Sequence, residues 1–441
     1  MRLLPANHVE RITTMLKEQL KKVEEKLRDV KWRPLPKSEE SRVYAVDGSQ
    51  GKARLSGTII YMVSSFAFGS GRPYRLFYTN AMLYNYGISD QMIRLQMETL
   101  ENKLGYLAGK LGDVDLVIMD GTLTGSLTRP PVYPESVRGI RTLEMFLGKA
   151  ELRRLVREFR KELDSHYRNL EDELMERGFS ESPILADMLV DRFFERFTRG
   201  KIMPERIVIR SRESLPEKIT IRLTDLERAA NEGKTAEDLL REIEEKKGIR
   251  VVATREELRD AFHVVLAYVE YLDSLERLLG LDLFYVAKSF YTRRLSSKAG
   301  VPIVDSAYLD AILRKLRGSE EPGYLKLEER IRVEHEIPDP LRDFFERVRR
   351  CGEEGVHGAY VRFERGDVIY MVQSNKEITR VLPKALHHRT GGYLRPLQRA
   401  HEGVKISQRE FRTALDVLMN HLRLKDPDLR VFVKYGRSPL E

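Results

Sequence analysis

Two aspartates have the surroundings expected of a cation site. Asp47 follows the apolar run Val43–Val46, Asp120 follows the apolar run Leu116–Met119, and glycine comes after each of them. In an open sheet, ligand sites form at the ends of strands. A buried pair of carboxylates repels itself unless it holds a cation or shares a proton. The pattern therefore predicts a metal site at Asp47 and Asp120, although a single Asp-Gly pair is also ordinary turn chemistry.

The segment between these aspartates offers a third carboxylate. A helix over about 89–111 is predicted by an apolar stripe that contains Ile93, Met97, Leu100, Leu104 and Leu107. At about 100° per residue, Glu101 lies roughly 80° from the centre of this stripe and Glu98 roughly 140°. We therefore expect Glu101 to reach the site and Glu98 to face water. The alternative for Glu101 is a surface ion pair with a nearby base such as Lys103.

Three side chains farther along the chain are also candidates. Asp305 follows another apolar run, where it could bind a metal or cap a helix that begins near Ala307. His401 lies among basic residues and is either a ligand or an ordinary packed or surface histidine. Lys288 follows the strand-like run Leu283–Ala287, where it could offer a positive charge to a phosphate or remain a surface lysine.

Such a set of side chains suits the hydrolysis of phosphodiesters. Two divalent ions about 3.5–4 Å apart can activate a water and stabilise the leaving oxygen. Carboxylate oxygens favour Mg²⁺ or Mn²⁺, and an imidazole shifts the preference toward Mn²⁺. The sequence contains no phosphate-binding G-x-x-x-x-G-K-[ST] motif and no G-x-S-x-G motif. Its single cysteine, Cys351, excludes a disulfide framework and a multi-cysteine zinc site.

The predicted order of elements would bring these residues together. A strand at 43–46, a hairpin of 58–68 and 74–79, the helix at 89–111 and a buried strand at 116–119 follow the layout of an RNase H-like core. The other predicted elements are a helix at 6–30, strands at 251–253, 283–287, 360–363 and 368–372, and helices at 256–279, 307–316, 394–402 and 408–424.

The predicted fold is α/β, with a mixed sheet flanked by helices and a large charged helical insertion. Residues 1–35 form an N-terminal helix, and 36–135 form the first part of the core. Residues 136–250 are dense in charged residues with helical periodicity, broken by a strand-like patch at 207–209, and they are interpreted as the insertion. Residues 251–441 complete the core.

The charge and composition of the chain indicate what kind of partner and what cellular location to expect. The 441 residues carry a net charge of +9, and residues 375–441 hold 14 Lys and Arg against 7 Asp and Glu. This basic excess favours a phosphate-bearing partner, with a solvated surface as the alternative. The 33% of charged residues exceeds the usual ~25% and is typical of a hyperthermophile, or of a helix-rich mesophile protein. No apolar run of membrane length and no signal peptide are found, so a cytoplasmic protein is expected.

The ordered set of motifs resembles the archaeal NurA nuclease family. The segments that carry the resemblance are Ala45–Ser49, the helix with Glu101, Leu116–Gly121, Val286–Lys288, Val304–Asp305, Gly392–Leu397 and Ala400–His401. The resemblance implies an RNase H-like (PIWI-like) core, a ring-shaped homodimer and Mn²⁺-dependent cleavage of DNA. It also implies a hexameric HerA translocase as partner in the resection of DNA double-strand breaks for homologous recombination.

Carried over residue by residue, the resemblance implies a set of five catalytic metal ligands, which are Asp47, Glu101, Asp120, Asp305 and His401. Lys288, Arg395 and Arg399 would hold phosphates, and Tyr393 could stack on a base or belong to the core. The expected activity is a 5′–3′ exonuclease with possible single-strand endonuclease activity. The alternatives are a non-catalytic DNA-binding adaptor of a motor ATPase and, less well supported, an actin-like ATP-binding fold, which also places Asp-Gly after a first strand.

Overall fold

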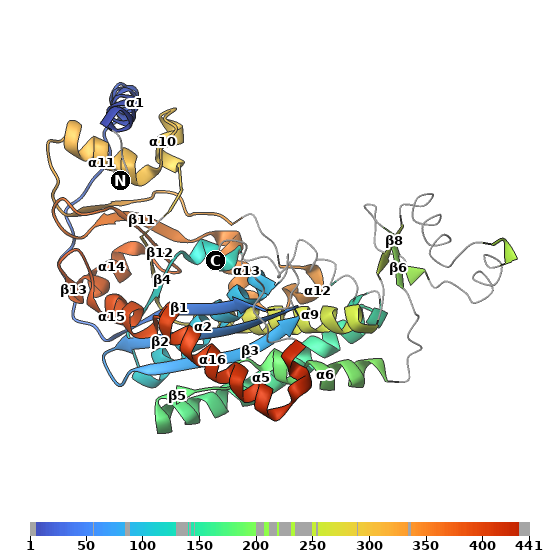
Figure 1. Cartoon of the computed structure of the whole chain (residues 1–441). Coiled ribbons are helices and arrows are strands. Elements are labelled where there is room, and N and C mark those ends of the chain that lie inside the picture. The colour runs from blue at the N-terminus through green and yellow to red at the C-terminus, as the bar shows by residue number, and fades with distance from the viewer. Residues whose placement is uncertain are drawn as a thin grey trace.

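A computed structural model gives the fold of the chain (Figure 1). It describes residues 6–55, 57–83, 89–128, 140, 143–144, 146–199, 207–210, 218–219, 231–233, 249–252, 255–288, 290–333 and 337–431. None of the helices within these ranges is long and apolar enough to cross a membrane.

A nine-stranded mixed sheet is the centre of the described structure. Its strand order is β10-β11-β12-β9-β4-β1-β2-β3-β5. The strands are β1 Val43–Arg54, β2 Thr58–Gly69, β3 Tyr74–Leu83, β4 Leu116–Asp120, β5 Phe179–Ser180, β9 Leu283–Ala287, β10 Gly323–Lys326, β11 His357–Arg362 and β12 Tyr370–Ser374. β1, β4 and β9 are parallel neighbours, whereas β2 and β3 continue from β1 as an antiparallel meander.

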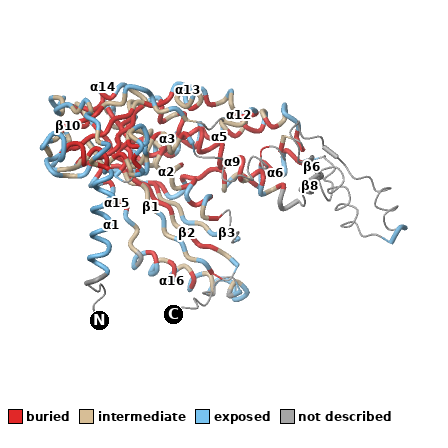
Figure 2. The backbone as a smooth tube through the Cα atoms, turned by 90° about the horizontal axis from the view of Figure 1, so that it is seen from above, coloured by how far each residue is buried: buried red, intermediate tan, exposed pale blue. Residues whose placement is uncertain are grey.

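Helices cover both faces of this sheet. The described helices are α1 Ala6–Glu24, α2 Ser89–Gly112, α3 Leu123–Leu127, α5 Lys149–Arg177, α6 Leu185–Thr198, α9 Arg255–Leu278, α10 Arg294–Lys298, α11 Asp305–Lys315, α12 Asp339–Arg342, α13 Glu346–Glu354, α14 Ile378–His387, α15 Arg395–Val404 and α16 Gln408–Lys425. α2, α5, α6 and α9 share one hydrophobic core with one face of the strands. α14 and α15 share a second core with the opposite face. Figure 2 shows buried stretches throughout the sheet and along the inner faces of these helices, whereas α1 is exposed along much of its length.

The two-residue period of the strands decides where the candidate residues point. Ala45, Ile118 and Val286 belong to the core under α14 and α15. Asp47, Asp120 and Lys288 each follow one of these residues by two positions, and side chains two apart along a strand share a face. The three polar residues therefore leave β1, β4 and β9 on the side of the sheet that α15 covers.

Most of the predicted elements are confirmed, but the first strand is longer than predicted. β1 runs for 12 residues, and its parallel pairing with β4 stops at Val46 and Met119. The prediction that Asp47 ends a strand is wrong, because β1 continues beyond it as the partner of β2. The strand end that opens the site is that of β4. The N-terminal helix is also shorter than predicted and ends at Glu24.

The charged segment 136–250 is mainly helical from 149 to 198, whereas four short strands also lie in its described parts. α5 and α6 are buried in the same core as α2 and α9, and the patch at 207–209 is a strand, β6 Ile207–Arg210. β6 pairs with β7 Lys218–Ile219 and β8 Ile249–Val252 in a small sheet. Much of this segment lies outside the described residues, so the proposed domain boundaries remain predictions.

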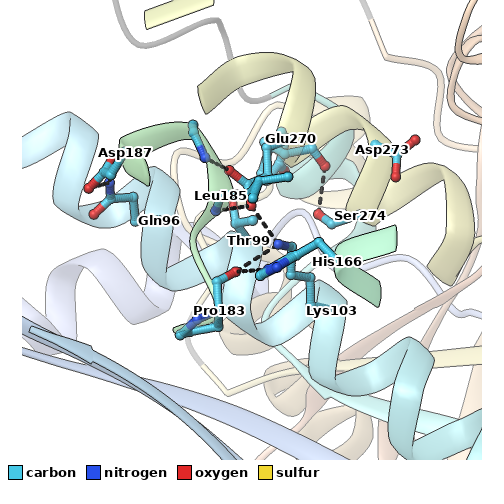
Figure 3. A network of polar contacts seen from close by, with 12 residues as sticks. Gln96, Thr99, Lys103, His166, Pro183, Leu185, Asp187, Glu270, Asp273 and Ser274 are labelled. Atoms are coloured by element: carbon cyan, nitrogen blue, oxygen red, sulfur yellow. Dashed lines mark hydrogen bonds and ion pairs between the residues drawn. The ribbon is translucent and has the colours of Figure 1, made fainter. Parts of the chain in front are cut away.

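A buried ion pair fixes α2 against its neighbours. Lys103 Nζ lies 2.5 Å from Glu270 Oε1 of α9 and donates to the carbonyl oxygen of Pro183. Glu270 also accepts from the backbone N–H groups of Leu185 and Ala186 at the start of α6 (Figure 3). Lys103 and Glu270 are almost completely buried. This network holds the part of α2 that carries Glu101.

Replacing Lys103 with Met should lower the free energy of unfolding by about 3–5 kcal/mol, because it leaves the Glu270 carboxylate buried without its cation. The matched control is Lys110→Met on the same helix, whose pair with Glu171 is exposed and should contribute less than about 1 kcal/mol. Denaturant unfolding measures both. Equal effects of the two variants would contradict the structural role of the buried pair.

Candidate functional site

Three elements far apart in the sequence meet at one group of metal-ligand side chains. Asp47 of β1, Asp120 of β4 and His401 of α15 each offer a ligand atom, and these atoms lie within 4.8 Å of one another. The parallel register pairs Val46 with Met119, so the residues that follow are neighbours. The predicted cluster of Asp47, Asp120 and His401 is therefore present in the fold.

Asp47 is the most enclosed of the three side chains. It is 8% exposed, and its Oδ2 lies 2.6 Å from Nδ1 of His401. Its other oxygen accepts a hydrogen bond from the backbone N–H of Gly48. The imidazole of His401 remains 55% exposed. The contact with Asp47 orients the ring while leaving much of it accessible to a substrate.

Asp120 lies at the mouth of the site, where β4 ends. Its Oδ1 accepts from the N–H of Gly121, which turns the chain out of the sheet at φ 95°. Burial raises the pKa of Asp120, and the negative charge of Asp47 raises it further. The positive charge of Lys288 acts in the opposite direction. The site thus disfavours a second negative charge unless a cation accompanies it.

Glu101 approaches the same strands from the opposite layer of helices. Burial raises its pKa well above the usual value, and the charges of Glu98, Asp47 and Asp120 add to this effect. A Cβ atom at Gly48 would lie only 2.3 Å from Glu101 Oε1. Glycine at position 48 therefore leaves the space through which Glu101 reaches β1. Glu101 lies next to the group of three rather than inside it.

The prediction for Glu98 is wrong, and so is the alternative that was considered for Glu101. Glu98 does not face water, because its side chain is 13% exposed and pairs with Arg94. Lys103 is not a surface partner of Glu101, because it is buried against Glu270. The helical angle gave the direction of each side chain, but it did not show which elements pack beside it.

Asp305 lies outside the group of three, in a different environment. It is completely buried, and its carboxylate accepts hydrogen bonds from three backbone N–H groups and one hydroxyl. The donors are the N–H groups of Arg294, Leu295 and Ser296 and the hydroxyl of Tyr360. This geometry is that of a capping group rather than a ligand, but Asp305 does not cap the helix near Ala307 that the sequence suggested. The helix that it caps is α10, because α11 itself begins at Asp305.

Lys288 and Tyr393 lie beside the carboxylates of the site, because the charge of Lys288 lowers the pKa of Asp120 and the charges of Asp120 and Asp47 raise the pKa of Tyr393. Lys288 Nζ lies 4.6 Å from the centre of the Tyr393 ring, so it covers one face of that ring. Tyr370 packs on Tyr393 at 5.4 Å, which leaves little of the ring for a base. Arg395 and Arg399 are exposed on α15, the helix of His401, and Arg399 pairs with Glu402.

The donor set fits a hard divalent cation. Carboxylate oxygens and one imidazole are ligands that Mn²⁺ and Mg²⁺ accept. Burial and neighbouring carboxylates raise the pKa values of Asp120 and Glu101, so ionising both in the absence of a cation is unfavourable. A cation between these groups would relieve that repulsion.

Comparison with known proteins decides the family. The family model described as "NurA domain" matches residues 41–406. The chain belongs to the NurA family. It is 46% identical over 456 residues to the DNA double-strand break repair nuclease NurA of Pyrococcus furiosus, and the match covers 100% of both chains. The resemblance found in the sequence is thereby confirmed, and with it the prediction of an enzyme of the nuclease class.

Solved NurA structures share the fold over nearly the whole chain. A NurA structure with bound dAMP and manganese is 44% identical, with a TM-score of 0.81 over 97% of this chain and 100% of the other. A NurA structure with manganese is 42% identical, with a TM-score of 0.76 over 95% of this chain and 99% of the other. The mixed α/β sheet flanked by helices is therefore a NurA fold.

Replacing Gly48 with Ala should displace the Glu101 carboxylate and weaken Mn²⁺ binding at least about tenfold, while the metal-ligand residues stay unchanged. Isothermal titration with Mn²⁺ measures the effect. Gly352→Ala is the control, because a Cβ at position 352 has nothing within 4 Å. Unchanged Mn²⁺ affinity in Gly48→Ala would show that the position of Glu101 does not matter to the site.

The raised pKa of Glu101 predicts how the stability of the metal-free protein depends on pH. Between the ordinary and the raised pKa, the folded state binds more protons at Glu101 than the unfolded state does. Stability in EDTA should therefore fall as the pH rises through this interval. Glu101→Gln removes the contribution of Glu101 to this dependence and should raise the melting temperature at neutral pH by roughly 1–3 °C. The exposed variant Glu328→Gln is the control, and a lower melting temperature in Glu101→Gln would contradict the account.

Proposed function

We propose that this chain is a divalent-metal-dependent deoxyribonuclease whose reaction centre is the group of Asp47, Asp120 and His401. The convergence of these side chains from β1, β4 and α15 is the observation that carries the proposal. The name of the Pyrococcus furiosus relative and the dAMP and manganese in a related structure support it. Both point to the same chemistry as the donor set.

Mn²⁺ is the proposed metal, with Mg²⁺ as a possible substitute and two ions in each site. Asp47, Asp120 and His401 would hold the metal, and Glu101 would complete the oxygen donors. Four such side chains offer more donor atoms than one ion needs. When bound, the metal supplies charge that activates water and stabilises the leaving oxygen. Asp305 is left out of this set because four donors already occupy its carboxylate.

The protein's own side chains would place the substrate and handle protons around the metal. The Asp47 carboxylate contacts Nδ1 of His401, which would leave the other ring nitrogen of this half-exposed side chain for a metal or a substrate. Lys288 and Arg395 would bind non-bridging phosphate oxygens beside the site. Because Lys288 extends from β9 next to Asp120, its charge is positioned to offset that of a phosphate near the carboxylates.

An RNase H-like core is the fold that we propose for the catalytic half. The strands β3-β2-β1-β4-β9 lie in this order, with an antiparallel meander followed by two parallel strands. The helix between β3 and β4 carries Glu101, and the aspartates lie on the two central strands. This arrangement matches the order of elements expected from the sequence.

The finer features of the activity are proposed from the resemblance to the family. We propose 5′–3′ exonuclease action, with possible single-strand endonuclease activity, in the resection of double-strand breaks. A HerA-type hexameric ATPase would be the partner of a homodimer. The net charge of +9 supports a polyanionic substrate. A non-catalytic adaptor would have no use for buried carboxylates that repel one another, which favours the enzyme over that alternative.

Asp120→Ala should lower DNA cleavage at least about 100-fold, because it removes a metal ligand from the centre of the site. Degradation of 5′-labelled and 3′-labelled duplexes with Mn²⁺, Mg²⁺ or EDTA, at elevated temperature, measures the activity and its polarity. Asp339→Ala, which removes an exposed carboxylate paired with Lys149, is the control. DNA binding by the wild type without cleavage, even with a motor partner added, would support the adaptor instead.

A further inference from the structure

In the segment that follows β9, residues 290–294, side chains packed on Tyr360 alternate with exposed side chains. Phe290 is buried, with its ring 5.7 Å from that of Tyr360. The hydroxyl of Thr292 lies 3.3 Å from the Tyr360 hydroxyl. Between these anchors, the Tyr291 side chain is 86% exposed, and Arg293 after them is also exposed. We call residues 290–294 the display loop.

Asp305 holds the far end of the display loop. Its backbone N–H donates to the carbonyl oxygen of Thr292 at 2.9 Å. Its carboxylate accepts from the N–H of Arg294 and of the next two residues, and from the hydroxyl of Tyr360. A fully buried residue thus fixes the backbone on both sides of Arg293. The loop presents Tyr291 from a rigid base, so less conformational entropy is lost when a ligand contacts it.

All charged residues of this segment are basic. Lys288, Arg293 and Arg294 form no ion pair with an acidic residue in the described parts of the chain. On α11 and just after it, the basic side chains of Arg314 and Arg317 do pair with carboxylates. Unpaired cations beside an exposed aromatic ring are the combination with which proteins bind single-stranded nucleic acid.

The display loop lies within a short reach of the metal-ligand group. Val286 of β9 pairs with Asp120, and its carbonyl oxygen accepts from the N–H of Gly121. Tyr291 follows Val286 by five residues, so the chain between them spans at most about 18 Å. A strand whose phosphate lies at Asp120 would have its next few nucleotides at this distance.

We propose that Tyr291 is a base-stacking residue for single-stranded DNA that enters or leaves the metal site, with Arg293 and Arg294 as its phosphate contacts. Asp305 is then the positioning residue of this surface. The proposal rests on the proposed nuclease function and assigns the contact for the unpaired strand. It gives Tyr291 the stacking role that was one of two alternatives for Tyr393, whose ring is already in contact with Lys288 and Tyr370.

The affinity for oligothymidylate in EDTA tests the proposal without cleavage. Tyr291→Ala should weaken binding roughly 5- to 100-fold, because one base loses its stacking partner. Tyr291→Trp should retain the affinity. Leu316→Ala, which removes another exposed apolar side chain, is the control and should have no effect. Unchanged affinity in Tyr291→Ala would overturn the proposal.

Salt dependence and oligomeric state distinguish single-stranded DNA from a second copy of the chain as the partner of this surface. Arg293→Ala should lower the slope of log affinity against log salt by about 0.7, since it removes one phosphate contact to a single strand. If Tyr291→Ala instead changes the mass of the protein in solution and leaves DNA affinity intact, the loop contacts a second copy and the proposal fails. Failure of the proposed nuclease function would appear separately, as absence of cleavage by the wild type.

Asp305→Ala distinguishes a positioning residue from a metal ligand. We expect faster hydrogen exchange at residues 290–296 and weaker binding of oligothymidylate, with Mn²⁺ affinity within about twofold of wild type. Tyr360→Phe, which removes one hydrogen bond to the same carboxylate, provides the test if Asp305→Ala does not fold. Loss of Mn²⁺ binding in Tyr360→Phe or Asp305→Ala, with unchanged exchange in the loop, would overturn the assignment.

Discussion

Electrostatic repulsion between desolvated carboxylates is the constraint around which this protein is organised. Asp47 and Asp120 lie on neighbouring strands, and Glu101 adds a third carboxylate from the layer of α2. Burial raises the pKa values of Asp120 and Glu101. The charge of Asp47 raises both further, and the charge of Asp120 adds to the effect on Glu101. An apo protein holds such a group together only because the surrounding packing is strong. The parallel pairing of β1 with β4 and the two hydrophobic cores supply that packing.

The two layers of helices contribute side chains to the site from opposite faces of the sheet. α2 delivers Glu101 past Gly48, and the buried Lys103–Glu270 pair holds that helix in place. α15 delivers His401 from the other layer, where its ring contacts Asp47. The parallel pairing of β1 and β4 stops at Val46 and Met119, directly before the two aspartates. Side chains from both layers of helices therefore reach the carboxylates where the two strands stop pairing.

Local sequence patterns were sufficient to predict the positions of the two aspartates, but not which side chains and elements surround them. Short apolar runs predicted the strands before Asp47 and Asp120, because a strand buried on both faces has that composition. Nothing in the helical periodicity of α2 showed that Glu98 would be covered, since coverage depends on distant elements. His401, 354 residues from Asp47, could be placed only by tertiary contacts or by resemblance to a family. The sequence prediction missed the display loop. Its pattern is the alternation of Phe290, Tyr291, Thr292 and Arg293.

Anomalous diffraction from crystals soaked in Mn²⁺ tests the central claim most directly. The account predicts anomalous density bounded by Asp47, Asp120 and His401, with Glu101 at its edge, and none at Asp305. Density at Asp305 would contradict the assignment of that residue to the display loop. Absence of density at Asp47 and Asp120, under conditions in which the protein cleaves DNA, would contradict the metal centre itself.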